Sequence, residues 1–284
     1  MYDRITLGVG GDVNLISSRL YNHPECVFPI TISKDETKDS VTYIYFDPSD
    51  DLFILDQYVG VVAEYIIDRY ENRLLRRILE EKHAQLSPVA KREILKDKEY
   101  FSDDPEIGYG ARKQAVLLSV YDYLKEDATM LIDGFVAFRL KEYEQLLQNL
   151  ANRLVEHYIA KKEYHEFVDL LKYFVNMQQP RPRLAHVIVQ DGGGYILLDE
   201  QGEDITAHCF SDFIDGECLL TEEAYDDLLI SVLITLAPEE LMVHNENAIT
   251  NRELFSTISQ VFDGKITYCN ACSLCKKEDA PKDC

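Results

Sequence analysis

The first 50 residues alternate short apolar runs with polar turns. Runs at residues 4–8, 27–32 and 41–46 are rich in β-branched and aromatic side chains, which predicts three strands. Residues 13–21, which lie between the first two runs, predict a helix. The pattern therefore indicates a small α/β unit over residues 1–50.

From residue 51 to residue 180 the apolar positions recur every three or four residues, as they do on amphipathic helices. The apolar stripe of the first helix consists of Val59, Val62, Ile66, Tyr70, Leu74 and Ile78. A serine–proline pair at residues 87–88 predicts the start of a second helix. Further helices are predicted over residues 112–125, 132–159 and 164–177. We therefore expect residues 51–180 to form a helical region.

Residues 181–284 return to short apolar runs. The runs at 185–190 and 195–199 flank a glycine-rich turn, which predicts a β-hairpin. A strand, a helix and a second strand follow between residues 241 and 269, and they predict a βαβ unit with parallel strands. This region is expected to be an α/β domain with a cysteine-rich C-terminal tail, and the whole chain an α+β protein.

The longest apolar stretch, residues 228–237, has about half of the roughly 20 residues that a membrane helix needs. Pro238 ends it, so the stretch predicts a buried helix and no membrane insertion. The N-terminus lacks a basic segment followed by a long apolar one, which argues against a signal peptide. The seven cysteines are odd in number and three of them share one heptapeptide. That distribution does not suit a disulfide framework and predicts a reducing, cytoplasmic location.

The balance of charges restricts the partners of this acidic protein. Its 284 residues include 29 Lys and Arg against 51 Asp and Glu, for a formal net charge of −22. Duplex nucleic acid and anionic membranes both require a basic surface. The composition therefore predicts that the protein does not bind nucleic acid.

The sequence pattern with the clearest chemistry is the cysteine-rich tail. Cys269, Cys272 and Cys275 follow one another at steps of three residues, and Cys284 ends the chain. Thiolates at this spacing can converge on one soft metal centre. The spacing also matches the start of a bacterial ferredoxin cluster run, but the cysteine that follows three residues later in ferredoxins is absent. Zinc and an iron–sulfur cluster are both predicted alternatives.

Two residues are candidates for the fourth ligand, His244 and Cys284. His244 and Cys269 are each the fourth residue of a predicted strand in the βαβ unit. If these strands are adjacent and in step, both side chains lie at the carboxyl edge of the sheet, where open α/β sheets bind ligands. A site of three cysteines and His244 is therefore one prediction, and an all-cysteine site completed by Cys284 is the other.

No catalytic residues can be named from the sequence. It contains no nucleophile elbow, P-loop or kinase-type motif set. The turn at residues 8–11 follows a predicted strand, but Val13 stands where a dinucleotide-binding fingerprint has its third glycine. These absences favour a non-enzymatic role. A small-ligand or nucleotide-binding enzyme that uses the carboxyl edge of the βαβ unit is one alternative, and a thiol or metal redox sensor is another.

Several segments resemble the YtxC-like family of sporulation-associated proteins. The resemblance is carried by residues 133–143 (DGFVAFRLKEY), 163–167 (EYHEF), 171–175 (LKYFV) and 226–231 (DDLLIS). It implies a role in sporulation and brings no catalytic residue with it. Within residues 133–143 we expect the phenylalanines to pack inward and Arg139 to pair with Glu142.

These observations together lead to one functional hypothesis. The chain is expected to be a cytoplasmic, sporulation-associated protein that acts through contacts with a protein partner. Its 18 tyrosines support such contacts, because tyrosine is enriched at protein interfaces. A metal site at the C-terminus accompanies this role.

Overall fold

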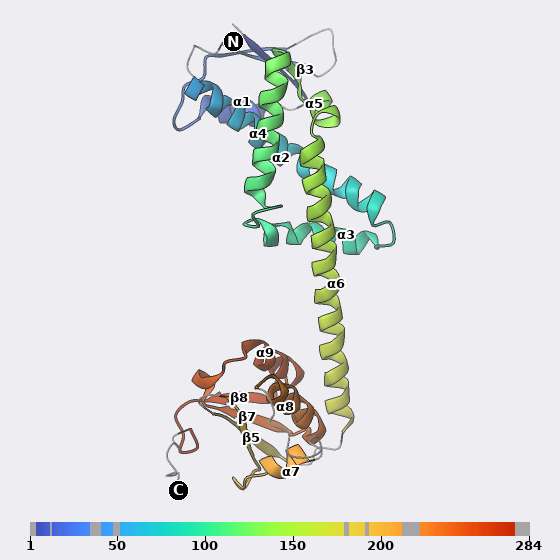
Figure 1. Ribbon diagram of the computed structural model, residues 1–284, viewed down its shortest axis with the longest axis vertical. Helices are drawn as coiled ribbons and strands as arrows, with labels where there is room; N and C mark the ends of the chain where they lie inside the picture. Colours follow the sequence, from blue (N-terminus) through green and yellow to red (C-terminus); the bar gives the residue numbers. More distant parts are fainter. Residues whose placement is uncertain are drawn as a thin grey trace. The chain divides into compact units, whose positions relative to one another are not determined.

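The protein has an α+β fold, as the sequence predicted, with two mixed four-stranded sheets (Figure 1). The computed structural model describes residues 4–11, 13–34, 41–47, 52–178, 182–190, 193–211 and 222–275. Contacts within the chain group it into two compact units, Met1–Ile159 and Ala160–Cys284.

The sheet of the first unit has the strand order β2-β3-β1-β4. Its strands are β1 (Ile5–Gly10), β2 (Ile30–Lys34), β3 (Val41–Phe46) and β4 (Thr129–Leu131). The central strand β1 pairs antiparallel with β3 and parallel with β4. Sequence analysis did not predict β4, because its three residues are too few to form a recognisable pattern.

Strand β2 begins three residues later than the apolar run predicted. Pro29 has no backbone N–H to donate to a neighbouring strand, which makes it a poor strand residue. Val27 leaves 91% of its surface exposed, so its apolar side chain does not contribute to the core. Helix α1 (Asn14–Tyr21) follows β1 at almost the predicted position.

The helices of the first unit and the connection to the second come next along the chain. They are α2 (Leu52–Lys82), α3 (Pro88–Lys96), the 3-10 helix η1 (Asp97–Phe101), α4 (Tyr109–Glu126), α5 (Ile132–Phe138) and α6 (Lys141–Met177). The predicted boundary between a helix over 132–159 and a helix over 164–177 was wrong. The backbone leaves the helix at Arg139 and Leu140, and α6 then continues without a break to Met177. Residues 159–164 contain Ala, Lys and Glu, which favour a continuous helix.

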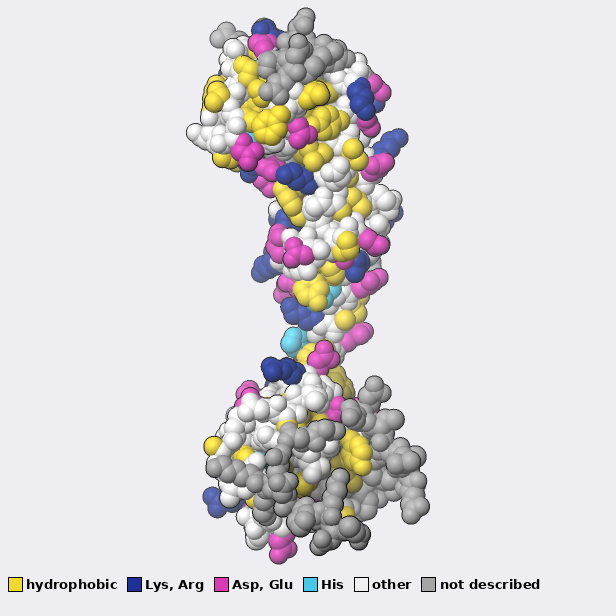
Figure 2. Space-filling view, turned by 60° about the vertical axis from the view of Figure 1, so that its left-hand side comes forward, with side chains coloured by type: hydrophobic (Ala, Val, Ile, Leu, Met, Phe, Trp, Pro, Cys, Tyr) yellow, Lys and Arg dark blue, Asp and Glu magenta, His cyan; other side chains and the backbone are white. Residues whose placement is uncertain are grey.

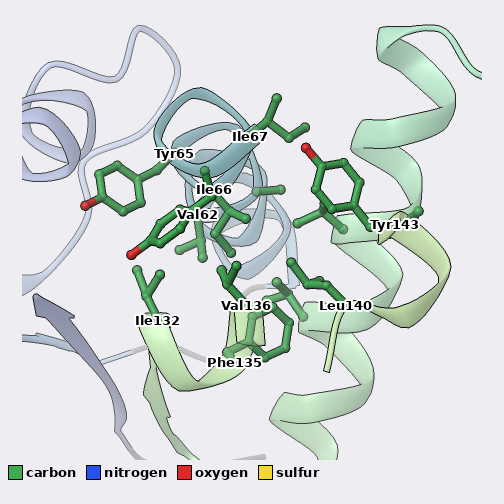
Figure 3. Packing of buried hydrophobic residues seen from close by; sticks show 14 of the residues in the cluster. Val62, Tyr65, Ile66, Ile67, Ile132, Phe135, Val136, Leu140 and Tyr143 are labelled. Atoms are coloured by element: carbon green, nitrogen blue, oxygen red, sulfur yellow. The ribbon is translucent and has the colours of Figure 1, made fainter. Parts of the chain in front are cut away.

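The apolar stripe predicted on α2 is buried. Val62 and Ile66 face α5 and the start of α6, where Phe135 and Tyr143 are also buried (Figure 3). Tyr70 is buried as well, and its hydroxyl donates to Asp133 on α5. The expectation that both phenylalanines of residues 133–143 pack inward is only half right. Phe135 is 2% exposed, whereas Phe138, the last residue of α5, is 77% exposed. Arg139 contacts Glu126 rather than Glu142, because α5 ends before a helical pair with Glu142 can form.

The second unit contains the predicted β-hairpin and the predicted βαβ unit. Its sheet has the order β6-β5-β7-β8, with β5 (Leu184–Val189), β6 (Tyr195–Leu198), β7 (Glu240–His244) and β8 (Ile266–Cys269). Strands β5 and β6 are antiparallel, whereas β5, β7 and β8 are parallel to one another.

Helices cover one face of this second sheet. They include α8 (Glu222–Leu236) and α9 (Arg252–Val261); the unit also contains α7 (Thr206–Ser211) and the 3-10 helix η2 (Glu246–Ala248). Alternate sheet residues such as Val187 and Val243 point into this core, together with Leu233 and Ile258 from the helices. The apolar stretch at 228–237 lies largely within α8, where Leu229, Val232 and Leu233 are buried and Thr235 is exposed. Among the described residues, no helix combines the length and the apolar character needed to cross a membrane.

Candidate metal centre

His244 and Cys269 lie opposite each other at the carboxyl ends of two adjacent strands. The register of β7 and β8 pairs Leu241 with Ile266 and His244 with Cys269, which is the alignment that the sequence predicted. Because side chains alternate along a strand, His244 and Cys269 project from the face opposite the one that carries Val243 into the helical core. The ends of β7 and β8 thus bring an imidazole and a thiol together.

The segment after β8 folds back over this edge and brings in two more thiols. Asn270 fixes the turn, because its Oδ1 accepts from the backbone N–H of Glu246 at 2.8 Å. Its Nδ2 donates to a carboxylate oxygen of the same glutamate at 3.2 Å. The backbone N–H of Asn245 donates to the carbonyl of Cys269 at 3.0 Å. These bonds tie the start of the tail to the residues that follow β7.

Four donor atoms therefore converge. The Nδ1 atom of His244 lies 3.3 Å from Sγ of Cys272 and 3.4 Å from Sγ of Cys275. Sγ of Cys275 lies 3.5 Å from Sγ of Cys272 and 3.8 Å from Sγ of Cys269. All four donor atoms lie within 4.8 Å of one another, so this cluster can hold a metal ion. Of the two predicted ligand sets, the structure brings together the three cysteines and His244.

The polypeptide also provides hydrogen bonds to the sulfur atoms. Partial desolvation on its own would raise the pKa of the Cys272 thiol, but backbone N–H groups of Cys275 and Leu274 donate to its sulfur and lower the pKa below the usual value. Desolvation dominates at Cys275, where the pKa is raised. The turn therefore favours a thiolate at Cys272, and the thiolate is the form that binds metals.

His244 is the buried member of the cluster, with 1% of its surface exposed. Desolvation lowers its pKa, and the neighbouring His186 lowers it further. The imidazole is therefore neutral near pH 7 and one of its nitrogens has a free lone pair. Neutral imidazole is the form that coordinates metals.

A fifth residue, His186, contacts the cluster. The sequence did not predict this contact. Nδ1 of His186, on the central strand β5, lies 2.9 Å from Nε2 of His244. Nothing in the spacing of the two histidines indicates this contact. Only the pairing of β5 with β7 and the shared face of the sheet place the two rings together.

Two other predicted features are Cys284 and the glycine turn at residues 8–11. Cys284 lies outside the described residues. Of the turn predicted at residues 8–11, Gly8 and Gly10 lie within β1, where a Cβ at Gly10 would come within 2.4 Å of an Asp133 carboxylate oxygen. Gly11 has a φ of +78°, a conformation that glycine adopts readily.

A pocket of about 540 Å³ lies beside the hairpin turn of the second unit and the N-terminus of α9. Its lining includes Tyr195, Asp226, Asn251 and Glu253. Both carboxylate oxygens of Asp226 are already engaged, one by the Tyr195 hydroxyl and one by Nδ2 of Asn251. Two carboxylates, Asp226 and Glu253, and one cation, Arg252, line this pocket.

Comparison with known proteins gives one family. Residues 56–267 match the YtxC-like family. The chain is 24% identical over 157 residues to the "Uncharacterized protein YtxC" of Bacillus subtilis (strain 168). This alignment covers 55% of the present chain and 54% of the relative, so the chain spans about half the length of the curated protein it matches. No solved structure matches the chain. His186 and His244 lie within the family match, whereas the three cysteines follow it.

Proposed function

The chain belongs to the YtxC-like family, and we propose that it is a zinc-binding protein that acts through protein contacts in spore-forming cells. The zinc centre consists of Cys269, Cys272, Cys275 and His244 and stabilises the C-terminal unit. The observation that carries the proposal is the spacing of the four donor atoms.

That spacing fits a single tetrahedral ion. With metal–sulfur bonds of about 2.3 Å and metal–nitrogen bonds of about 2.0–2.1 Å, a tetrahedron has sulfur–sulfur edges of about 3.8 Å and sulfur–nitrogen edges of about 3.6 Å. The closest donor pairs here are separated by 3.5 and 3.8 Å between sulfurs and by 3.3 and 3.4 Å between sulfur and nitrogen. An iron–sulfur cluster distributes its protein ligands over several iron atoms, which requires wider spacing. The donor set therefore favours mononuclear zinc.

A site with four protein ligands favours a structural role over catalysis. Catalytic zinc keeps one coordination position for water or substrate, whereas structural zinc is closed by four protein ligands. Residues 270–275 form turns and bends without regular secondary structure. A metal bound to both β7 and this segment would fix the segment against the sheet edge.

Exposed apolar side chains support the proposed protein contacts. Figure 2 shows hydrophobic side chains gathered on one face of the N-terminal unit. The exposed large apolar residues of that unit include Tyr21, Leu118 and Phe138. On α6, Phe167 is 50% exposed and Tyr173 is 58% exposed. Clustered apolar surface of this kind is typical of interaction sites.

Two experiments test the two parts of this proposal. Elemental analysis of anaerobically purified protein is expected to give one zinc per chain, and Cys272→Ser is expected to lower the zinc content. Stoichiometric iron with visible absorption would contradict the zinc assignment. Affinity purification from sporulating cells is expected to return a specific protein partner. Recovery of only the background proteins of an untagged control would contradict the contact role.

A second candidate function, redox sensing, is favoured by the 3.5 Å separation of the Cys272 and Cys275 sulfurs. A peroxide would oxidise the two thiolates to a disulfide and be reduced to two hydroxide ions, and the metal would lose two ligands. Thiol titration and zinc release after peroxide treatment test this candidate. An unchanged thiol count would exclude it.

A further inference from the structure

We infer that His186 is a positioning residue of the zinc centre, which holds His244 in the tautomer that presents Nδ1 to the metal. The inference rests on the proposed function, because it assigns a role toward the ion that the cluster would bind. It concerns a side chain outside the four proposed ligands.

The geometry gives each nitrogen of His244 a separate partner. Nδ1 faces the sulfurs of Cys272 and Cys275 at 3.3 and 3.4 Å. Nε2 faces Nδ1 of His186 at 2.9 Å, which is hydrogen-bond distance. The ring of His244 is thus held between the thiols on one side and a second imidazole on the other.

The protonation of a neutral imidazole then determines which nitrogen can bind metal. A neutral ring carries one proton, on either Nδ1 or Nε2. Coordination through Nδ1 requires the proton on Nε2, and a buried N–H group requires an acceptor. His244 is 1% exposed, and His186 Nδ1 lies where that acceptor is needed. An acceptor lone pair at His186 therefore favours the metal-binding tautomer of His244.

The charge of the site explains why histidine suits this position. Metal-bound histidines usually donate their second N–H to a carboxylate, a backbone carbonyl or water. Three thiolates already outweigh the two positive charges of Zn²⁺ by one negative charge. A carboxylate in contact with the buried ring would add a second negative charge, which is costly away from water. The neutral imidazole of His186 accepts the same hydrogen bond without that cost.

The sheet fixes the position of His186. On β5 it lies opposite Leu198 of β6 on one side and Met242 of β7 on the other. Because both neighbouring strands are paired with β5, its backbone cannot shift easily. Ile188, two residues further along the same face, is directly opposite His244 and is half-buried. Ile188 therefore provides a matched control position.

The test compares three variants of the full-length chain. His186→Leu removes the acceptor, His186→Asn places an amide oxygen near the position of Nδ1, and Ile188→Val changes only packing. Zinc affinity is measured by competition with a chromophoric chelator. We expect His186→Leu to weaken zinc binding about 10- to 100-fold, as the loss of such supporting contacts does elsewhere. His186→Asn and Ile188→Val are expected to stay within a few-fold of the wild type.

Nuclear magnetic resonance of protein labelled with ¹⁵N in its histidines reports the protonation and metal binding of each ring nitrogen. A change in packing alone would not alter these. In the zinc-loaded wild type, the His244 ring, assigned by its loss in His244→Gln, is expected to show a protonated Nε2 and a metal-shifted Nδ1. Wild-type affinity and an unchanged His244 ring signal in His186→Leu would overturn the role of His186 and leave the zinc centre standing. Equal weakening by His186→Leu and Ile188→Val would also overturn it. A wild-type chain that binds no zinc would overturn both proposals.

Discussion

The buried carboxylate of Glu71 gives the sharpest test of what holds the first unit together. It lies on α2 with 2% of its surface exposed. Nε of Arg112, on α4, donates to it at 2.9 Å, and the Tyr143 hydroxyl, on α6, donates at 3.0 Å. Nζ of Lys98 lies 3.3 Å from its other oxygen. This one side chain therefore joins three helices and η1.

Replacing Glu71 with alanine leaves a buried cation without its counter-ion. Arg112 is 3% exposed, and the Ile107 carbonyl, at 2.5 Å from Nη1, remains as an acceptor. The Tyr143 hydroxyl also loses its acceptor at a fully buried position. Removing one partner of a buried ion pair costs about 3–5 kcal/mol. We expect Glu71→Ala to lower the free energy of unfolding of the first unit by that amount.

Differential scanning calorimetry is the assay; the chain has two compact units, and we expect each to give its own transition. The double variant Glu71→Leu and Arg112→Met removes both charges and is expected to be less destabilised than Glu71→Ala. Glu144→Ala is the control, since Glu144 pairs with Arg77 at an exposed position beside Tyr143. Its cost is expected to stay below about 1 kcal/mol. If Glu71→Ala unfolds at the wild-type temperature, or the double variant is the less stable one, the reasoning about the buried pair is refuted.

Three further predictions follow from local contacts. Chelation of zinc is expected to lower the melting temperature of the second unit only. An ion present at 1,000 times its dissociation constant adds about 4 kcal/mol to the free energy of unfolding of the unit that binds it. An equal effect on both units would contradict the proposed site. Asn251→Ala removes the side-chain cap of α9, which is expected to cost about 1 kcal/mol in urea unfolding, and also the bond from Nδ2 to Asp226. Asn176→Ala, which removes one exposed hydrogen bond from Lys265, is the polar control. The pKa of Asp104 is lowered by backbone N–H donors of Glu106 and Ile107 and by Arg153. The contribution of Asp104 to the free energy of unfolding is therefore full above the ordinary aspartate pKa and is lost as the pH falls through the lowered pKa. The difference in stability between the wild type and Asp104→Asn is expected to narrow in acid. A difference that does not change with pH would contradict this prediction.

Elements formed by residues close in sequence were predicted well, whereas contacts between distant residues were not. The hairpin was predictable because its strands and turn are local in sequence. The pairing of His244 with Cys269 was predicted by assuming that the two strands of the βαβ unit lie adjacent and in step, and β7 and β8 do so. Strand β4 was missed, since it has three residues and depends on its partner β1. The contact of His186 with His244 depends on the pairing of β5 with β7 across 58 residues of sequence, and no spacing rule encodes it.

Errors in the helical region have a similar origin. The break between α5 and α6 falls at Arg139 and Leu140, within a stretch whose local pattern favours one continuous helix. Leu140 lies between the two helices and is 3% exposed, so the break leaves an apolar residue buried outside regular helix. Phe138, the last residue of α5 before this break, is 77% exposed.

The measurement that tests the central claim most directly is the metal content of the full-length chain purified without oxygen or added metal. It is measured alongside Cys272→Ser and His244→Gln. The account predicts one zinc per chain in the wild type, no visible absorption, and a clear loss of zinc in both variants. Equal metal content in all three proteins, or no metal in the wild type, would contradict the centre formed by Cys269, Cys272, Cys275 and His244.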